Sequence, residues 1–325
     1  MPDSNQENTV TNPPQNATSD HAARAVSGSR VEVWPNLPYE AWKDTYDTLH
    51  MWTQIAGKIR LALSPMVNHW WQVTLYVTPR GLTTSSIPYE TRTFEILFDF
   101  IDHNLIVHTS DDSTKYVSMY SRSVADFYRE LMSVLRSLGI EVNINPMPQE
   151  VPNPIAFDRD TVHTSYDKEY ANRVWRILVE TDSVFKEFRG RFTGKCSPVH
   201  FFWGSFDLAV TRFSGRPAPV RPGADRVTRE AYSHECSSAG FWPGSGSLPA
   251  PAYYAYTVPE PSNLSKAQIR PDGASYNTQL GEFILLYDDV RSAPDPRAML
   301  LDFLQSTYVA GADLAGWDRH SLERS

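Results

Sequence analysis

Residues 39–78 have the sequence YEAWKDTYDTLHMWTQIAGKIRLALSPMVNHWWQVTLYVT, and the spacing of the apolar residues changes once within it. Up to Leu63 the apolar side chains recur at steps of three and four, which places them on one stripe of a helix. Pro65 cannot continue that helix. From Trp71 to Val77 apolar and polar residues alternate, as in a half-buried strand. The stretch therefore predicts a helix over 39–63 and a strand over 71–77.

The rest of the chain repeats the order of a helix, several strands and a helix. Strands in runs between helices are typical of an α+β protein, here with mostly antiparallel sheets backed by helices. A local sequence similarity between His69-Trp-Trp71 and His200-Phe-Phe202 favours an internal duplication. Further helices are expected over 123–138, 167–188 and from Pro296 onward, and further strands over 94–100, 105–107, 201–213, 253–256 and 283–286.

The same pattern predicts the domain organisation. Residues 1–30 are polar and aperiodic, so we expect a disordered tail. A first α+β half is expected over 31–145, a linker over 146–164, a second α+β half over 165–315 and a tail over 316–325. We expect the two halves to pack as one unit.

Composition limits the function. The 325 residues are 41% hydrophobic and 12% aromatic, enough to bury a sizeable core, and the formal net charge is −8. An acidic chain without a basic run gives no electrostatic reason to expect a nucleic-acid partner. No apolar run is long enough for a bilayer, and no signal peptide is evident. The two cysteines suit reduced thiols, so a cytoplasmic location is expected.

Several polar residues of the first helix fall on or beside its apolar stripe. A helical wheel puts Arg60 inside the apolar arc, with His50 at the edge and Gly57 between. Because an unpaired charge in an apolar interface is costly, Arg60 should have an acidic or a ligand partner. Either it snorkels or forms a buried ion pair, or it binds a carboxylate or phosphate.

The predicted strand over 201–213 carries Asp207 on the same face as Trp203. Aspartate is depleted in strand interiors. If this face is solvated, Asp207 needs no partner. If it is covered, Asp207 is a candidate partner for one of three arginines, namely Arg60, Arg212 or Arg216.

The densest polar cluster is Tyr232-Ser-His-Glu-Cys-Ser-Ser238, which the glycines and serines around it place in a loop that packs Phe241 and Trp242. His234 and Glu235 could serve as an acid–base pair there, and Cys236 could act as a nucleophile. Metal binding by His234 and Cys236, with His200 or Glu235, matches no standard spacing, so no metal site is predicted. No glycine-rich phosphate loop, serine nucleophile elbow or dinucleotide fingerprint is present, and the sequence names no cofactor.

Six short segments are distinctive: Trp34-Pro-Asn-Leu-Pro38, Leu49-His-Met-Trp-Thr-Gln-Ile55, Gly57-Lys-Ile-Arg60, Asn68-His-Trp-Trp71, Phe202-Trp-Gly-Ser-Phe-Asp-Leu208 and Ser237-Ser-Ala-Gly-Phe-Trp-Pro-Gly244. Together they resemble a family of uncharacterised, mainly bacterial proteins that is classed as a domain of unknown function. The resemblance spans about Val31 to Arg291. It implies no activity, cofactor or catalytic residue, only that this region is one evolutionary unit.

Two hypotheses of function follow. The first is a pocket between the two halves for a small polar or ring-bearing ligand; if the protein is an enzyme, it would be a hydrolase or transferase that uses His/Glu acid–base chemistry. Its catalytic residues would be His234 and Glu235, and its ligand-binding residues would be His50, Arg60, His69, Trp203, Asp207 and Trp242. The alternative is a non-catalytic interaction or scaffold protein whose partner surface is formed by aromatic loops over 218–261.

Overall fold

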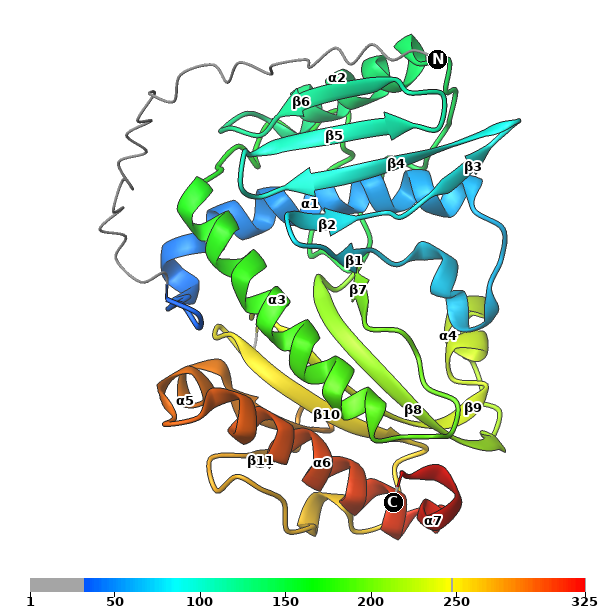
Figure 1. Ribbon diagram of the computed structural model, residues 1–325, viewed down its shortest axis with the longest axis vertical. Helices are drawn as coiled ribbons and strands as arrows, with labels where there is room; N and C mark the ends of the chain where they lie inside the picture. The colour runs from blue at the N-terminus through cyan, green and yellow to red at the C-terminus, as the bar shows by residue number, and fades with distance from the viewer. Residues whose placement is uncertain (1–31, 247, 325) are drawn as a thin grey trace, which may run out of the picture. The chain divides into compact units, whose positions relative to one another are not determined.

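Helix α1 spans Tyr39–Leu63, the bounds that the apolar spacing predicts (Figure 1). The computed structural model describes residues 32–246 and 248–324, so the tail expected over 1–30 lies outside the described residues. Burial is not confined to the apolar stripe of α1, because polar side chains such as Thr53 and Gln54 are also fully buried. The helix is therefore enclosed on all sides along most of its length, and each of its polar groups needs a partner inside the protein.

The first sheet is an antiparallel meander that follows α1 in the chain. Its strands pair in the order β1-β2-β4-β5-β6, and β3 pairs with β4. In β5 buried and half-buried residues alternate strictly, as expected for a sheet with one face on the core. The strands are β1 (Tyr76–Val77), β2 (Gly81–Thr83), β3 (Ile87–Tyr89), β4 (Arg92–Asp99), β5 (Asn104–Thr109) and β6 (Thr114–Ser118).

The second sheet is also antiparallel, in the order β7-β8-β9-β10-β12-β11. The α+β class is thus confirmed. The segment 218–261, which the scaffold hypothesis treated as aromatic loops, contains two central strands of this sheet, and the second of them covers the strand predicted over 253–256. The strands are β7 (His200–Phe202), β8 (Asp207–Pro217), β9 (His234–Trp242), β10 (Ala252–Val258), β11 (Ser275–Asn277) and β12 (Glu282–Leu286).

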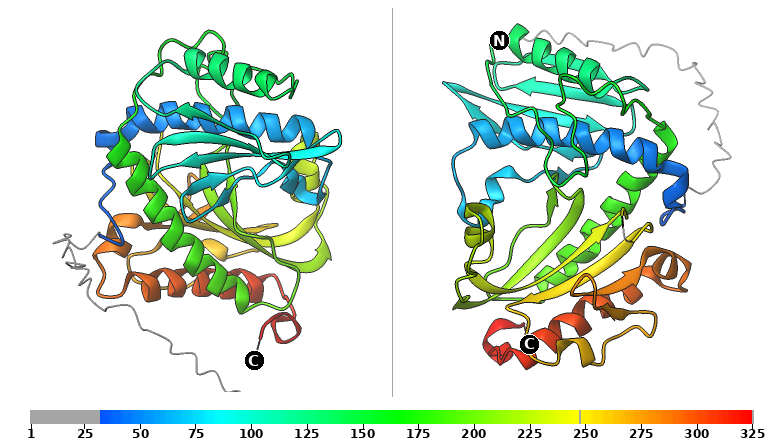
Figure 2. Two further views of the ribbon diagram at one scale, coloured as in Figure 1. Left: turned by 45° about the horizontal axis from the view of Figure 1, so that its top comes forward. Right: turned by 180° about the vertical axis from the view of Figure 1, so that it is seen from behind.

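The helices begin at residues that their sequence signals indicate. Ser123 caps α2 by accepting a hydrogen bond from the Asp126 backbone N–H at 3.0 Å, and Pro296 is the first residue of α6. Helices α3 and α6 lie side by side against one face of the second sheet (Figure 2). The helical elements after α1 are η1 (Asn68–Val73), α2 (Val124–Ser137), α3 (Lys168–Gly190), α4 (Arg226–Ala231), η2 (Leu264–Lys266), α5 (Tyr287–Ser292), α6 (Pro296–Leu314) and α7 (Arg319–Leu322).

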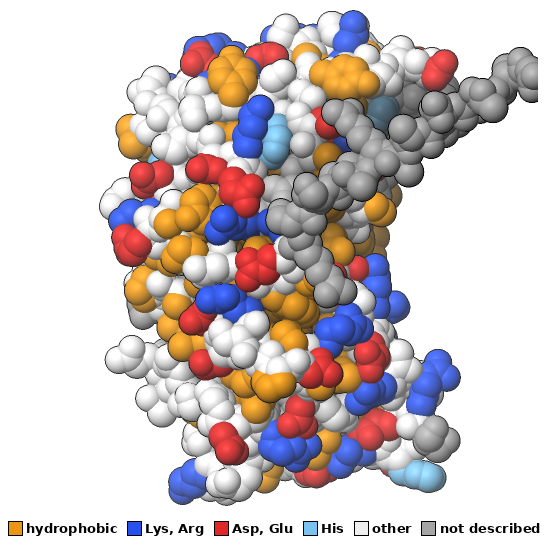
Figure 3. Space-filling view, turned by 60° about the vertical axis from the view of Figure 1, so that its left-hand side comes forward, with side chains coloured by type: hydrophobic (Ala, Val, Ile, Leu, Met, Phe, Trp, Pro, Cys, Tyr) orange, Lys and Arg blue, Asp and Glu red, His pale blue; other side chains and the backbone are white. Residues whose placement is uncertain are grey.

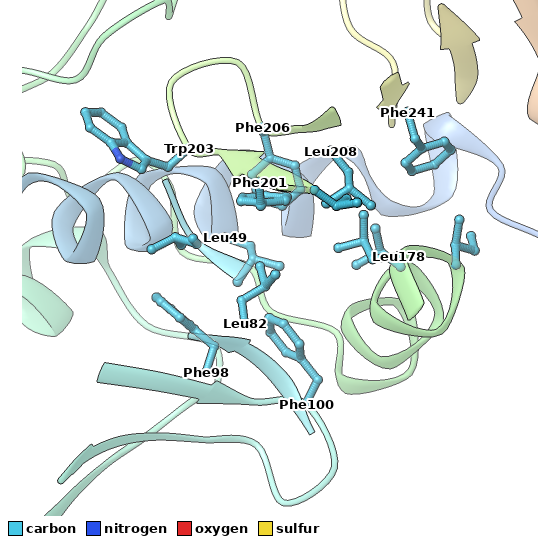
Figure 4. Close-up of a cluster of buried hydrophobic side chains, with 14 of the residues drawn as sticks. Leu49, Leu82, Phe98, Phe100, Leu178, Phe201, Trp203, Phe206, Leu208 and Phe241 are labelled. Carbon is cyan, nitrogen blue, oxygen red and sulfur yellow. The ribbon is translucent and has the colours of Figure 1, made fainter. Parts of the chain in front are cut away.

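A single antiparallel bridge joins the two sheets. The backbone N–H groups of Leu75 and Phe201 each donate to the other residue's carbonyl at 2.9 Å. The first strand of each sheet lies beside this bridge at one edge of its sheet. Residues 33–246 and 248–324 form one unit, and one hydrophobic core runs through both sheets (Figure 4). The internal duplication stays a prediction, as do the boundaries of the halves.

The strand predicted over 71–77 is wrong for most of its length. Residues 68–73 form the 3-10 helix η1, and only Tyr76 and Val77 form a strand. Within η1, His69 and Trp70 have positive φ angles of 58° and 62°. A pattern of alternating residues carries no information on such left-handed turns, which bulky residues rarely adopt.

Two further predictions need correction. The single strand expected over 201–213 is a hairpin, β7 and β8, in which Phe206 takes a positive φ of 57° at the turn. The loop expected over 232–244 is mainly β9. Its small residues do not mark a turn here but make room for a neighbour, because a Cβ on Gly240 would lie 2.3 Å from the Tyr254 hydroxyl.

Candidate functional site

A surface hollow lies where the last turn of α1 meets η1 and the edges of both sheets. Its volume is about 370 Å³. Most of its wall comes from residues before position 90, and the start of β7 closes it. We call it the Arg60 hollow, and it is lined by Arg60, Ser64, Pro65, Val67, Trp71, Gln72, Tyr76, Ser86, Pro88, Pro198 and His200.

Arg60 brings a buried positive charge to this hollow. The residue is only 8% exposed. Its Nη1 donates to the Thr74 carbonyl, and its Cζ lies 5.3 Å from the centroid of the Tyr76 ring. Its Nε is buried and has no hydrogen-bond partner in the described part of the chain.

No carboxylate in the described part of the chain neutralises this guanidinium. Within residues 32–246 and 248–324, no Asp or Glu oxygen lies within 4.0 Å of its nitrogens. Desolvation lowers the pKa of Arg60, while Tyr76 acts in the opposite direction. Because the ordinary pKa of arginine is above 12, the side chain still carries its charge. The acidic partner considered from the sequence is therefore absent from the described residues, which is compatible with the ligand alternative.

His200 supplies a second polar group, and it is neutral. Its ring is almost fully buried, with centroids 5.4 Å from Trp71 and 5.6 Å from Tyr76. Desolvation lowers its pKa to about 3, and the charges of Arg60 and Arg189 act in the same direction. Its Nε2 is buried without a hydrogen-bond partner among the described residues. A buried nitrogen without a hydrogen-bond partner is uncommon in a folded protein, and this one belongs to a residue that lines the hollow.

The strained backbone of η1 positions the aromatic wall. His69 donates from Nδ1 to the Ala231 carbonyl at 3.0 Å, so its Nε2 accepts from Lys195 Nζ at 3.2 Å. Gln72 accepts from the Val67 backbone N–H at 3.1 Å. These bonds fix η1 at both ends and hold Trp71 in the wall. Left-handed non-glycine residues cost about 1–3 kcal/mol each and persist where the surroundings hold them.

His50 and Trp203 lie in the protein interior and do not line the hollow. His50 Nε2 donates to the Gly204 carbonyl at 2.8 Å, and desolvation lowers its pKa to about 4. Trp203 donates from Nε1 to the Val73 carbonyl at 2.7 Å. Both side chains thus have partners within the chain, which indicates a structural role.

The predicted acid–base pair is split between two faces of β9. Consecutive side chains of a strand point to opposite faces. His234 lies beside His69, with ring centroids 5.7 Å apart, whereas Glu235 accepts from Arg216 at 2.7 Å and from Ser214 Oγ at 2.9 Å. The two groups therefore do not face one reacting atom, and neither lines the Arg60 hollow.

Asp207 belongs to a different cluster. It is buried, and it accepts hydrogen bonds from Ser205 Oγ and the Tyr254 hydroxyl. It forms no ion pair with the three arginines that the sequence suggested for it, of which Arg212 is enclosed by aromatic rings and Arg216 binds Glu235. Trp242, at the end of β9, is half-buried and also lies outside the wall of the hollow.

Only Arg60 of the eight predicted site residues lines the hollow. Trp71, Tyr76 and His200 were not among the predicted ligand-binding residues. His200 carried a usable signal, since it heads β7 in the same way that His69 precedes the first sheet. Trp71 and Tyr76 had no comparable signal in the sequence, because their place in the wall follows from the left-handed turn in η1.

The described residues give no geometric support for a metal site, a membrane-spanning helix or a strongly charged patch. No group of three or more His, Cys, Asp or Glu side chains there could hold a metal ion, and both cysteines are free. Among the helices described, none combines the length and the apolar character that crossing a membrane requires. On the face drawn in Figure 3, positive and negative side chains are interspersed, and neither sign forms a continuous patch.

Comparisons with known proteins give a family but no activity. The model of a family of unknown function, DUF5996, matches residues 34–324. No curated protein and no solved structure matched the chain. The match covers both sheets and all residues of the Arg60 hollow.

Proposed function

The chain belongs to this family of unknown function, and from the geometry of the hollow we propose that it binds a small organic anion at Arg60. One observation carries the proposal: a buried guanidinium that has no carboxylate partner among the described residues forms part of the wall of a surface hollow. Removing an ion from water without a counter-charge is strongly unfavourable. A ligand that brings the negative charge would recover part of that cost when it binds.

The size and the lining of the hollow support a small-molecule ligand. Its volume of about 370 Å³ is at the lower end of the range for ligand pockets. Aromatic rings and three prolines form rigid apolar walls, and a few polar groups lie among them. Because both the segment before position 90 and β7 contribute, the ligand would bind between the two predicted halves.

The polar groups favour binding over acid–base catalysis. His200 is the titratable imidazole in the wall, and a pKa of about 3 makes it a poor base near neutral pH. The pair His234 and Glu235 lies elsewhere. The hydrolase or transferase chemistry that the sequence suggested therefore has no geometric support in this hollow.

Replacing Arg60 by methionine should weaken the binding of small anions at least about tenfold, because hydrogen bonds to a charged group contribute about 1.5–3 kcal/mol. Isothermal titration with benzoate and phenyl phosphate would measure the change. Methionine keeps most of the volume and removes the buried charge, so R60M should be at least as stable as the wild type.

Lys58→Met is the matched control. Lys58 is a second buried cation on the same helix, 6% exposed, and it does not line the hollow. K58M should bind both anions as the wild type does. Equal affinities of R60M and the wild type, or no binding of either anion by the wild type, would contradict the proposal.

A further inference from the structure

The Arg60 hollow offers only one full charge to a ligand. Arg60 is the sole Lys or Arg among the lining residues, and His200 is neutral at physiological pH. The other polar groups of the wall are hydroxyls and the amide of Gln72, whose oxygen is already engaged. A ligand with one negative charge would balance this site, whereas a dianion would bring a second, uncompensated charge into partly desolvated surroundings.

One edge of the Arg60 guanidinium suits a planar anion. Nη1 donates to the Thr74 carbonyl and the side chain also hydrogen bonds to Tyr76, but Nε has no hydrogen-bond partner among the described residues, and Nη2 lies next to it. These two nitrogens form one edge of the guanidinium, and a carboxylate can accept from both along parallel hydrogen bonds. The Tyr76 ring, whose centroid lies 5.3 Å from Arg60 Cζ, limits the positions that the guanidinium can take.

The remaining wall suits a flat apolar group. Trp71 and Tyr76 present rings, and their centroids lie 5.4 and 5.6 Å from that of His200. Pro65, Pro88 and Pro198 add surface that loses no side-chain entropy on binding. Aromatic side chains prefer offset or edge-to-face contacts with another ring, which a small hollow of this kind can provide.

We propose that the ligand of the Arg60 hollow is a monocarboxylate that carries a flat apolar or aromatic group. This inference rests on the proposed anion binding and adds its ligand class. The carboxylate binds Nε and Nη2 of Arg60, and the apolar group packs against Trp71 and Tyr76.

Four probes separate the parts of this inference. Benzoate has the charge and the ring, acetate has only the charge, benzamide has only the ring, and phenyl phosphate is a dianion well above its second pKa of about 6. At about pH 8, titration of the wild-type protein should give the tightest binding with benzoate, by at least about tenfold over each other probe, the size of one charge-assisted bond.

The other possible results of these titrations would contradict different parts of the inference. Arg60-dependent binding of phenyl phosphate as tight as that of benzoate would overturn the monocarboxylate class but leave anion binding intact. Equal affinities for acetate and benzoate would overturn the inference that the ligand carries an apolar group. Benzamide binding as tightly as benzoate, or no binding of any probe, would overturn this inference together with the proposed function.

A wall variant tests the placement of the ring. Trp71→Leu should weaken benzoate binding at least about fivefold and leave acetate binding unchanged, because only the apolar contact is reduced. Trp71 is half-buried in the wall. Circular dichroism and the melting temperature would confirm that W71L is folded. Unchanged benzoate affinity in folded W71L would place the ring elsewhere and overturn this orientation.

Discussion

Replacing Gly57 by alanine should destabilise the protein by about 3 kcal/mol or prevent it from folding, because overpacking of a core is costly. A Cβ at this position would lie 2.2 Å from Cδ1 and 2.3 Å from Nε1 of Trp203. The indole cannot move aside easily, since it is 6% exposed and donates to the Val73 carbonyl. Urea denaturation monitored by circular dichroism would give the change in the free energy of unfolding.

Gly190→Ala is the matched control for this prediction. Gly190 is also helical, at the end of α3, and nothing lies within 4 Å of a Cβ built there. Alanine has a higher helix propensity than glycine, so G190A should be neutral or stabilising by up to about 1 kcal/mol. If G57A is as stable as G190A, the close contact between α1 and the indole is not a constraint on the fold.

The contact at Gly57 also links the core to the Arg60 hollow. The Trp203 indole is hydrogen bonded to Val73, the last residue of η1, and η1 carries Trp71 and Gln72 in the wall. A displaced indole would therefore disturb the hollow as well as the core. Trp203, predicted as a ligand-binding residue, would thus influence binding through η1 rather than through contact with the ligand.

The helices were the most predictable part of the fold, because their signals are local. Periodicity over six turns and a proline fix the ends of α1, and Ser123 and Pro296 mark the starts of α2 and α6. Strand β9 was missed because its small residues look like a loop in isolation. They are required by the Tyr254 ring from β10, a partner that the local sequence does not reveal.

The candidate site was only partly predictable for the same reason. A charge on the apolar arc of a helix stands out in the sequence, and that signal found Arg60. It also selected His50, because a wheel cannot distinguish a side chain that faces a hollow from one that meets backbone carbonyls. Trp71, Tyr76 and His200 come together only after η1 turns and the two sheets meet at Leu75.

A separate cluster of three carboxyl groups, formed by Glu150, Asp207 and Glu282, should control how stability depends on pH. Among the described residues, none of the three has a cation within 4.0 Å. Burial raises the pKa of each, and the charge of Asp207 raises those of Glu150 and Glu282 further. For Glu282 the pKa rises from 4.5 to about 7.

The direction of the pH dependence follows from the raised pKa of Glu282. Between its ordinary value and about 7, the folded protein binds more protons at this site than the unfolded chain does. Stability at this site is therefore highest below the unfolded pKa and falls as the pH rises through the folded pKa. Above a pH of about 7, Glu282 is ionised in the folded protein, and the burial of its charge then lowers the stability by the full amount.

Glu282→Gln should stabilise the protein by about 2 kcal/mol at about pH 8, since each pKa unit corresponds to about 1.4 kcal/mol and the side chain is partly exposed. The gain should shrink as the pH falls towards the pKa of an ordinary glutamate, because the wild-type group is then protonated. Chemical denaturation across this pH range would measure both effects. Glu141→Gln makes the same change on an exposed side chain and should have little effect at any pH. If E282Q and E141Q change the free energy of unfolding by the same amount at each pH, burial of the Glu282 carboxyl does not lower the stability. In that case Asp207→Asn should also leave the pH dependence of stability near neutrality unaltered.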